Sequence, residues 1–456
     1  MSAAGTTTGD IGIGNNNGGS VITGHSGGLE SIDGVGTNNV DLNFNSNTIV
    51  DWNTLNVDQG ETLNFNAVGG ATDLTVLNRV YNNMSKIYGT INANEGISNL
   101  ILSNPNGVFF DGATFTTAAD GNLMITTQDM TGATLNDMTN AHYTNLYGSD
   151  GKLISVQILN NSNFNIGGEY TIAAPAIKAS NSSIAAKTLK LVTANGQDYI
   201  DLGAKVPVNN KGVTFLQAMN IDGDVVITND VGAMAIYDGG TINGDLTVET
   251  AGNTFLNCMT YTQGQTVIPT TNDKLTVNGN VNVTSHGAQA FARNMDISGN
   301  LDMSNDGGFV DIGDIHVGGN ANLTTTGIAP VEDKKVYKHF VHVMGDTVVD
   351  GDMNIEASQN IHIGGYDYDA NQLAPGSLTV NGDLTAHTTD GHITTTIDTK
   401  ANKISYTSDK LNILMSDDAT LTADEYQFKA NGYIGGIKDY TDDQGRTFTK
   451  DVQIKY

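Results

Sequence analysis

The residues with the clearest capacity for chemistry are two histidines, His339 and His342, in a stretch that also holds Tyr337 and several lysines. Imidazole nitrogens bind transition metals, so two histidines three positions apart could form part of a metal site. A solvated loop explains the pair without a metal, and we adopt that interpretation. Tyr337, His339 and His342 are therefore candidates for a ligand-binding loop rather than for a metal centre.

A second polar stretch covers residues 366–371, where Asp367, Asp369 and Asn371 alternate with Tyr366 and Tyr368. Oxygen ligands at alternate positions are typical of the start of a calcium-binding loop. The glycine and the glutamate that complete such a loop do not follow at the required positions. We expect no metal and no cofactor, and we treat Tyr366, Asp367, Tyr368 and Asp369 as a second candidate ligand-binding loop.

Two further residues stand out by their rarity. Arg79 is the only arginine among the first 292 residues. It could form a structural salt bridge and bind backbone carbonyls, or it could contact a partner protein. The single cysteine, Cys258, cannot form a disulfide within the chain, and we interpret it as a small buried apolar residue.

The elements that position these residues are indicated by a repeat that begins near residue 215. Its kernel has seven positions. Positions one, five and seven are apolar, position three is Gly, position four is usually Asp or Asn, and positions two and six vary. The seven kernels place their glycines 21, 35, 20, 20, 32 and 31 positions apart, at Gly223, Gly244, Gly279, Gly299, Gly319, Gly351 and Gly382. The basic period is about 20 residues, and the longer intervals contain insertions.

This period predicts one coil of a parallel β-helix, with short strands joined at Gly-Asp or Gly-Asn corners. We expect an all-β, right-handed parallel β-helix of about 20 residues per coil, with an N-terminal cap and hairpins or loops outside the helix. The apolar kernel residues should face the core, and Asn or Asp at equivalent corners should form ladders. An array of β-sandwiches is the alternative, but it would not repeat one Gly-Asp corner at this interval.

The longer intervals divide the chain further. Insertions are predicted at 253–273, 328–344 and 363–376, as protruding loops that can carry function or as hairpins packed on the helix. We expect the Gly- and Asn-rich residues 1–39 to form a leading segment and cap, residues 40–214 to start the helix, and residues 215–430 to form its shaft. Residues 431–456 predict a terminal hairpin around 443–446, where we expect the shaft to be truncated.

Composition excludes several classes of partner. The 456 residues carry a net charge of −28, which leaves no basic patch for nucleic acid and disfavours an anionic membrane surface. No apolar run reaches the ~18 residues of a membrane span, so we expect no membrane insertion. The N-terminus lacks the basic and apolar regions of a signal peptide, which fits either a cytoplasmic protein or a mature fragment with an added start Met.

Three short motifs occur in order near the start of the predicted helix. They are Asn78-Arg79-Val80, then Ile-Tyr-Gly-Thr-Ile-Asn-Ala-Asn over 87–94, then Asn-Pro-Asn-Gly over 104–107. The last lies between the apolar runs 100–102 and 108–110, which predicts a strand, a sharp turn and a strand. The only tryptophan, Trp52, lies just upstream and is interpreted as a core anchor.

These motifs resemble the haemagglutination-activity domain, or two-partner-secretion domain, at the N-terminus of filamentous-haemagglutinin-like exoproteins. The resemblance covers residues 40–129 in detail and implies that residues 40–214 are the secretion domain. The Asn-Pro-Asn-Leu segment that such domains often contain is missing. The resemblance also implies that an outer-membrane transporter with periplasmic docking domains recognises the chain. The corresponding secretion motif would be Asn78, Arg79, Asn104, Pro105, Asn106 and Gly107.

The resemblance further implies a secreted bacterial surface adhesin that attaches to host cells or to other bacteria, with a glycan among the possible receptors. A stalk for a contact-dependent inhibition toxin or a haemolysin, and a polysaccharide-binding matrix protein, remain alternatives. Polygalacturonases share the β-helix, but Gly391-His392 is followed by Ile, and the Arg-Ile-Lys of those enzymes is absent. We therefore expect no catalytic residues and no enzyme.

Overall fold

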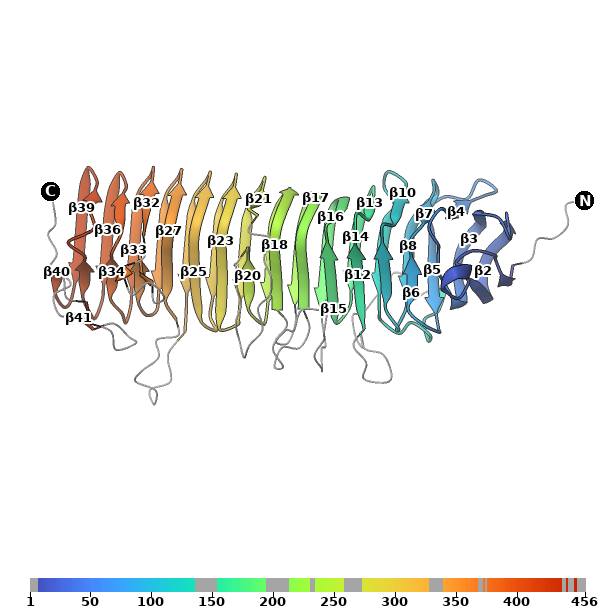
Figure 1. The fold of residues 1–456 in the computed structure, drawn as a ribbon, viewed down its shortest axis with the longest axis horizontal. Coiled ribbons are helices and arrows are strands. Elements are labelled where there is room, and N and C mark those ends of the chain that lie inside the picture. The colour runs from blue at the N-terminus through green and yellow to red at the C-terminus, as the bar shows by residue number, and fades with distance from the viewer. Residues whose placement is uncertain are drawn as a thin grey trace, which may run out of the picture. The chain divides into compact units, whose positions relative to one another are not determined.

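The computed structural model describes residues 7–135, 154–193, 213–229, 234–257, 273–327, 339–367, 372–373, 375–436, 440–441 and 447–448. Apart from one short 3-10 helix, η1 (Asn15–Asn17), the regular elements of these residues are strands (Figure 1). The chain divides into two compact units, the first mainly residues 1–236 and the second mainly 244–260 and 272–456. Strand β18 (Met234–Asn243) contains residues of both units.

The first unit begins with antiparallel strands. Strand β2 (Val21–Asp33) pairs with β1 (Gly9–Asp10) on one side and with β3 (Asn39–Thr54) on the other. Two carboxylates secure the loop that carries η1, because Glu61 accepts a hydrogen bond from the Gly14 amide and Asp58 accepts one from the Asn16 amide, both at 2.7 Å. An antiparallel layer of this kind covers the edge of the first coil.

From β3 onward the first unit consists of parallel strands in three columns. One column runs from β3 through β4 (Thr62–Ala67), β7 (Thr90–Ala93), β10 (Thr114–Thr117) and β13 (Asn163–Asn165) to β16 (Ser183–Thr193). The second runs from β3 through β5 (Leu74–Val80), β8 (Ile97–Ser103), β11 (Asn122–Thr126) and β14 (Glu169–Ala173) to β16. The third contains β6 (Ser85–Ile87), β9 (Val108–Asp111), β12 (Ser155–Leu159), β15 (Ala176–Ser180) and β17 (Val213–Asn229).

The second unit repeats this arrangement. Its kernel column contains β19 (Leu246–Thr250), β22 (Val281–Ser285), β24 (Leu301–Asn305), β26 (Ala321–Thr325), β28 (Met353–Ala357), β33 (Leu384–Thr388), β36 (Lys403–Ser408) and β39 (Glu425–Ala430). A second column contains β20 (Thr254–Leu256), β23 (Gln289–Ile297), β25 (Phe309–Val317), β27 (Val341–Val349), β29 (Ile361–Ile363), β34 (Ile393–Thr395), β37 (Ile413–Met415) and β40 (Ile434–Gly436). The third adds β21 (Leu275–Val277), β32 (Gly376–Val380), β35 (Asp398–Lys400) and β38 (Leu421–Thr422) to the ends of β23, β25 and β27.

Stacked kernels keep their register across insertions of different length. Val281 pairs with Leu301, which pairs with Ala321, at intervals of 20 residues. The next partners are Met353 and Leu384, at intervals of 32 and 31 residues, with no change in which kernel position pairs. The kernel positions that should face the core are buried, as predicted: Val281, Leu301 and Ala321 are each 0% exposed. The fold is thus all-β and parallel, with three strand columns closed around a core, and resembles a β-helix.

The predicted corner ladder is present and explains the glycine. The side-chain Oδ1 of Asn280 accepts a hydrogen bond from the Asn300 amide at 2.9 Å, and Asn300 in turn accepts one from the Asn320 amide at 2.8 Å. A Cβ on Gly319 would lie 2.3 Å from the Oδ1 of Asn300. Glycine is therefore required here by space, because the side-chain oxygen of the coil below lies where a Cβ would stand.

The predicted bounds of the three insertions are too wide, because they include residues that form strands. Residues 341–344 belong to β27, residues 254–256 form β20, and residue 363 ends β29. The long interval between Gly319 and Gly351 predicted an insertion that reaches residue 344, but Phe340 stacks on Phe309 of the preceding coil with ring centroids 4.6 Å apart. Within 363–376, β30 (Tyr366–Asp367) and β31 (Gln372–Leu373) form an antiparallel pair. Near the C-terminus, β41 (Tyr440–Thr441) pairs antiparallel with β42 (Thr447–Phe448).

Candidate functional site

The secretion-motif residues lie on adjacent coils of the first unit. Asn78 and Arg79 are consecutive in β5, so strand alternation directs their side chains to opposite faces. Asn78 faces the core, where its Oδ1 accepts a hydrogen bond from the Trp52 indole at 3.0 Å and its amide donates to the Ile101 carbonyl at 3.2 Å. Trp52 is 0% exposed and Asn78 is 1% exposed, so this pair is internal to the coil.

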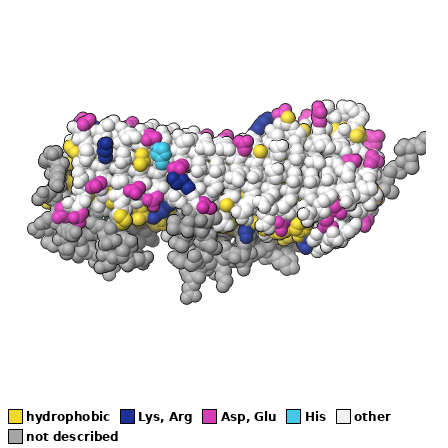
Figure 2. All heavy atoms as spheres, turned by 45° about the horizontal axis from the view of Figure 1, so that its top comes forward, with side chains coloured by type: hydrophobic (Ala, Val, Ile, Leu, Met, Phe, Trp, Pro, Cys, Tyr) yellow, Lys and Arg dark blue, Asp and Glu magenta, His cyan; other side chains and the backbone are white. Residues whose placement is uncertain are grey.

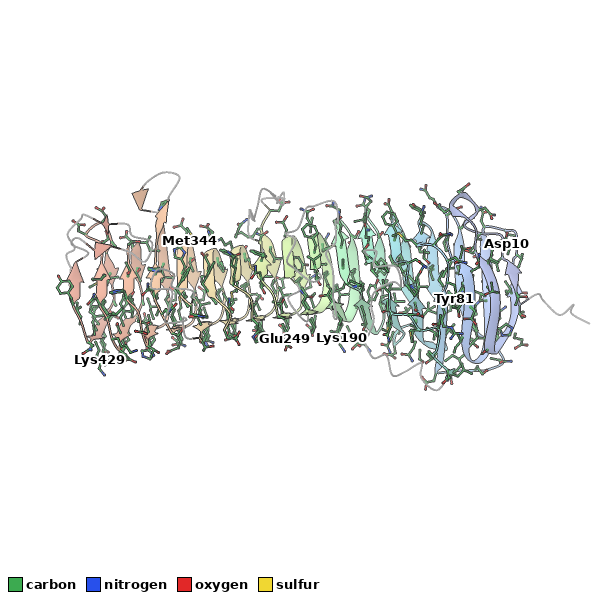
Figure 3. All side chains as sticks on the ribbon, turned by 90° about the horizontal axis from the view of Figure 1, so that it is seen from below. Asp10, Tyr81, Lys190, Glu249, Met344 and Lys429 are labelled. Carbon is green, nitrogen blue, oxygen red and sulfur yellow. The ribbon has the colours of Figure 1, made fainter. Side chains whose placement is uncertain are left out.

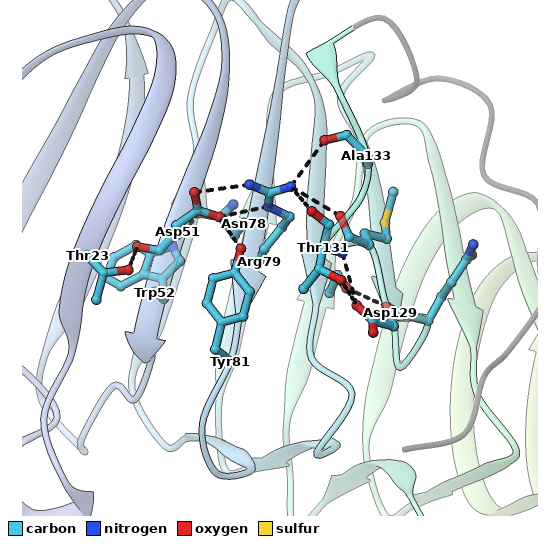
Figure 4. Close-up of polar contacts among 12 residues, drawn as sticks. Thr23, Asp51, Trp52, Asn78, Arg79, Tyr81, Asp129, Thr131 and Ala133 are labelled. Carbon is cyan, nitrogen blue, oxygen red and sulfur yellow. Dashed lines mark hydrogen bonds and ion pairs between the residues drawn. The ribbon is translucent and has the colours of Figure 1, made fainter. Parts of the chain in front are cut away.

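The Arg79 side chain faces outward, and its guanidinium is hydrogen-bonded to Asp51 and to backbone carbonyls. Its guanidinium binds both carboxylate oxygens of Asp51, with Nε to Oδ1 at 2.7 Å and Nη2 to Oδ2 at 3.0 Å (Figure 4). Its Nη1 donates to the backbone carbonyls of Met130, Thr131 and Ala133 at 3.3, 2.9 and 3.1 Å. Only 12% of the Arg79 side chain is exposed, so its donors are committed to contacts within the unit.

Asp51 is shared with a tyrosine. The Tyr81 hydroxyl donates to Asp51 Oδ1 at 2.7 Å, and Tyr81 is 40% exposed. Partial burial and the hydrogen bond to the Asp51 carboxylate raise the pKa of Tyr81 to about 12. Burial lowers the pKa of Arg79, but the hydrogen bond and the charge of Asp51 outweigh it, so that this pKa is raised and Arg79 stays charged.

The carbonyls that Arg79 binds belong to a covering segment, residues 128–135, on the outside of the coils. Beneath it, Ile49, Leu77 and Ile101 pair in register on consecutive strands and form a small outer core with Met130. Ser103 also anchors the segment, since its hydroxyl donates to the Gln128 carbonyl at 2.6 Å. Arg79 therefore keeps an apolar column covered that would otherwise face solvent.

The Asn-Pro-Asn-Gly motif forms the turn between β8 and β9, as predicted. Asn104 is 0% exposed, and its side-chain amide donates to the Asn83 carbonyl and the Ser85 hydroxyl, both at 2.9 Å. Its Oδ1 accepts a hydrogen bond from the Asn106 amide at 2.9 Å, which is an Asx turn. Gly107 has a φ of 96°, and a Cβ there would lie 2.8 Å from the Ser155 carbonyl oxygen.

The two motifs are joined through Tyr81. The side-chain amide of Asn106 donates to the Tyr81 carbonyl at 3.2 Å, while the Tyr81 hydroxyl binds Asp51. Asn106 is nevertheless exposed and Pro105 is half-buried. The folded unit thus presents Pro105, Asn106 and the Tyr81 ring at its surface, and it buries the rest of the motif.

The two histidines of the first candidate ligand-binding loop are built into the coils. His339 is 7% exposed, and its backbone amide donates to the Gln359 side chain at 2.9 Å. His342 lies in β27, where its Nδ1 is 3.0 Å from Asp311 Oδ2 and its Nε2 is 2.6 Å from the Gly364 carbonyl oxygen. These contacts tie neighbouring coils together, so His342 is not part of a protruding loop.

The remaining predicted residues are those of the second candidate ligand-binding loop, together with Tyr337 and Cys258. Tyr366 and Asp367 form β30, and only their backbone pairing is defined. Tyr337, Tyr368, Asp369 and Cys258 lie outside the described residues. Within the described ranges, no cluster of three or more His, Cys, Asp or Glu side chains could hold a metal, and no helix has the length and apolarity to cross a membrane.

Sequence reasoning missed Asp51, Tyr81 and the covering segment. Asp51 of β3 lies directly opposite Arg79 of β5. A sequence-based alignment of these two strands in the correct register would therefore have predicted the ion pair. The sequence of the covering segment does not reveal its contact with Arg79. The acceptors there are backbone carbonyls, and every residue type has a backbone carbonyl.

Comparison with known proteins gives little further information. No family model and no curated protein matches the chain. Among solved structures, the chain is similar to the HMW1 secretion domain from Haemophilus influenzae, with 16% identity and a TM-score of 0.38 over 89% of this chain and 100% of that one. A TM-score this low does not establish a common fold.

Proposed function

We propose that the first unit carries the signal by which an outer-membrane two-partner-secretion transporter, with periplasmic docking domains, recognises this chain for export. The main support is the ordered set of motifs, which the fold brings to adjacent coils. Asn78-Arg79 in β5 and the turn at 104–107 are connected through Tyr81, Asp51 and Asn106.

Because most of the motif is buried in the folded unit, a transporter can contact it only at certain stages of export. Asn78 and Asn104 are at most 1% exposed, and the donors of Arg79 are bound within the unit. A transporter that contacts these side chains must therefore meet them before the coils form. Export of an unfolded chain, followed by folding outside, satisfies this condition, since stacked coils can propagate from one formed end.

Asn106 offers the cleanest test of recognition. It is exposed, and its side-chain amide makes two hydrogen bonds at 3.2 Å, so Asn106→Ala should lower stability by less than about 1 kcal/mol. We expect the variant to be secreted severalfold less than the wild type when a transporter of this class is co-expressed. Secretion is measured as the amount in the medium relative to the amount in the cells.

Asn45→Ala is the matched control, because Asn45 is an exposed asparagine of the same unit with one long hydrogen bond of 3.3 Å to Glu30. Thermal unfolding of each purified variant, followed by Trp52 fluorescence, separates a loss of recognition from a loss of folding. Equal export of the Asn106 and Asn45 variants would show that the exposed part of the turn is not read by the transporter.

For the exported chain we propose attachment to host cells or to other bacteria, with a glycan as one candidate receptor and no enzymatic activity. The support is the same resemblance to adhesin N-termini. Labelled protein should bind cells or a glycan array above an unrelated acidic protein of similar charge, and incubation with acidic polysaccharides and calcium should release no products. Absence of binding in both assays would contradict the adhesive role.

We also propose that the coils wind in the right-handed sense at about 20 residues each, because connections between parallel strands of one sheet are right-handed in nearly all proteins. An experimental structure of either unit would decide this.

A further inference from the structure

The covering segment, residues 128–135, contacts three successive strands of one column, β3, β5 and β8. Its apolar contact is with Ile49, Leu77 and Ile101, which pair in register and form one cluster with Met130. Met130 is 6% exposed, so its side chain is nearly as buried as a core residue. The segment therefore lies across three coils rather than beside one of them.

A second column makes the polar contacts, two residues further along each strand. Asp51 pairs with Arg79, and Arg79 pairs with Ser103. Arg79, held by Asp51, donates to three backbone carbonyls of the covering segment (Figure 4). Ser103 donates to the Gln128 carbonyl at 2.6 Å. Each of the three coils therefore supplies one apolar and one polar residue to a single binding surface.

This surface exists only when the three coils are stacked. The coils lie near the start of the first unit, where Figure 3 labels Tyr81. Asp51 and Arg79 are 28 positions apart in the chain, so only the pairing of β3 with β5 brings them together. The covering segment follows all three strands in the sequence and binds across them. It can therefore close only after they have paired.

We propose that residues 128–135 act as a latch, which closes after the first three coils have stacked and then holds them together as one cooperative block. In a solenoid each coil contacts its neighbours, so an end coil can detach alone. The latch adds a link between coils that are not neighbours, because one apolar cluster contains Met130, Ile49 of β3 and Ile101 of β8. Contacts that form after the transition state slow unfolding and leave the folding rate unchanged.

The first test is the unfolding and refolding kinetics of the whole chain in denaturant, followed by the fluorescence of Trp52. Trp52 reports on these coils because it lies in β3 and donates to Asn78 of β5. In Met130→Ala the unfolding rate should rise at least about tenfold, since a buried side chain is lost from the folded state. The refolding rate should change by less than about twofold.

Thr131→Ala is the matched control in the same segment. Thr131 is exposed, and its contact with Arg79 is made by the backbone carbonyl, which the substitution keeps. Both rates should stay close to those of the wild type. If Met130→Ala slows refolding more than it speeds unfolding, the segment forms together with the coils and the proposal is overturned. Unchanged rates in Met130→Ala would overturn it too.

A variant with the latch open tests the order of closure at equilibrium. Met130→Asp places a carboxylate in the apolar cluster, so the segment should not seat. The coils should remain, with the circular dichroism and the Trp52 emission of the wild type, while the uncovered Ile49, Leu77 and Ile101 bind the apolar dye anilinonaphthalene sulfonate. A solvent-exposed Trp52 in this variant would show that the coils do not form without the segment, which contradicts the proposed order.

Ser103 provides a test of whether the contacts act through one latch. Ser103→Ala removes the bond to the Gln128 carbonyl and should speed unfolding severalfold. In the Met130→Asp background that bond is already lost, so Ser103→Ala should add almost nothing to the unfolding rate. An equal effect of Ser103→Ala in the two backgrounds would show that Ser103 acts independently of the segment, and would overturn the latch.

Discussion

Arg79 shows how one side chain can secure several parts of a fold. It donates hydrogen bonds to both carboxylate oxygens of Asp51 and to three backbone carbonyls of the covering segment. Lysine could not reproduce this arrangement, because a single ammonium group lacks the planar fork that spans a carboxylate. The structural role that the sequence left open for Arg79 is therefore present in the folded unit.

Replacement of Arg79 by lysine should lower the free energy of unfolding of the first unit by about 2 kcal/mol, since several hydrogen bonds to a charged group are lost. Denaturant unfolding followed by Trp52 fluorescence measures this loss. Amide exchange at 128–135 should also accelerate. The control is Lys187→Met, which removes an exposed ion pair with Asp120 and should change the stability little. Similar losses in the two variants would contradict the role of Arg79 as an anchor.

At the scale of the elements, the corner ladder is the feature that fixes one coil on the next. Each rung from Gly279 to Gly382 combines two hydrogen bonds. One joins the backbones of two glycines, such as Gly319 to Gly299 at 2.9 Å, and in the other a side-chain oxygen of Asn or Asp accepts from a backbone amide of the next coil. The chain uses glycine and asparagine together because the amide oxygen of one coil occupies the space above the glycine of the next.

Gly319→Ala should therefore destabilise the second unit by about 1–3 kcal/mol through crowding against Asn300. In an Asn300→Ala background the additional cost should fall, because the nearest clashing atom is gone and the next contacts are 3.0 Å away. Unfolding followed by circular dichroism gives the four values of this cycle. Gly24→Ala, at a strand glycine with nothing within 4 Å, is the control. Additive costs would rule out crowding by Asn300.

His387 links three coils of the second unit and should make their stability depend on pH. Its Nδ1 is 2.7 Å from Glu356 and its Nε2 is 3.0 Å from Asp409. Burial lowers the pKa of His387, but the hydrogen bonds to Asp409 and Glu356 outweigh this and raise it above its ordinary value of 6.5. A raised pKa means that the protonated histidine stabilises the fold fully below about pH 6.5, and that this stabilisation is lost as pH rises through the folded-state pKa.

The substitution His387→Gln should consequently cost more stability at about pH 5.5 than at about pH 8.5. Thermal unfolding at both values measures the difference. A variant that carries Glu356→Gln and Asp409→Asn, in which the histidine is kept, should lose most of the same pH dependence. An equal cost of His387→Gln at the two pH values would refute the proposed coupling.

At the scale of the whole molecule, the face in Figure 2 carries scattered acidic side chains with few lysines and arginines between them. The net charge of −28 favours solubility and disfavours polyanionic partners. The chain also divides into two compact units, each made of strands that contact neighbouring coils. In such proteins stability is close to a sum of terms between neighbours, so a local defect acts mainly on nearby coils.

The single tryptophan makes that locality measurable. Trp52 is buried in the first unit, so its fluorescence reports unfolding there, while circular dichroism reports both units. Gly319→Ala in the second unit should shift the circular dichroism transition more than the fluorescence transition. Identical shifts by both probes would show that the two units unfold as one.

Much of the fold was predictable because its main signal is local. The kernel pattern places apolar residues at alternate positions, and the structure buries them at those positions, as with Leu301 and Met303. The turn at 104–107 was predictable because its residue types determine its backbone. The position of His342 was not, since its bond to Asp311 depends on which coils are neighbours, a relation that composition does not reveal.

The corner ladder has a consequence for how such a chain can change its length. Residues 301–320 start just after one ladder position, Asn300, and end on the next, Asn320. In the present structure Asn320 accepts a hydrogen bond from the Asp352 amide. If residues 301–320 were removed, Asn300 would accept that bond instead. Duplication or loss of whole repeats, as unequal recombination produces, would preserve the register of the corner ladder. Gain or loss of any other number of residues within a kernel would break the ladder, so the copy number of coils can vary more freely than their sequence.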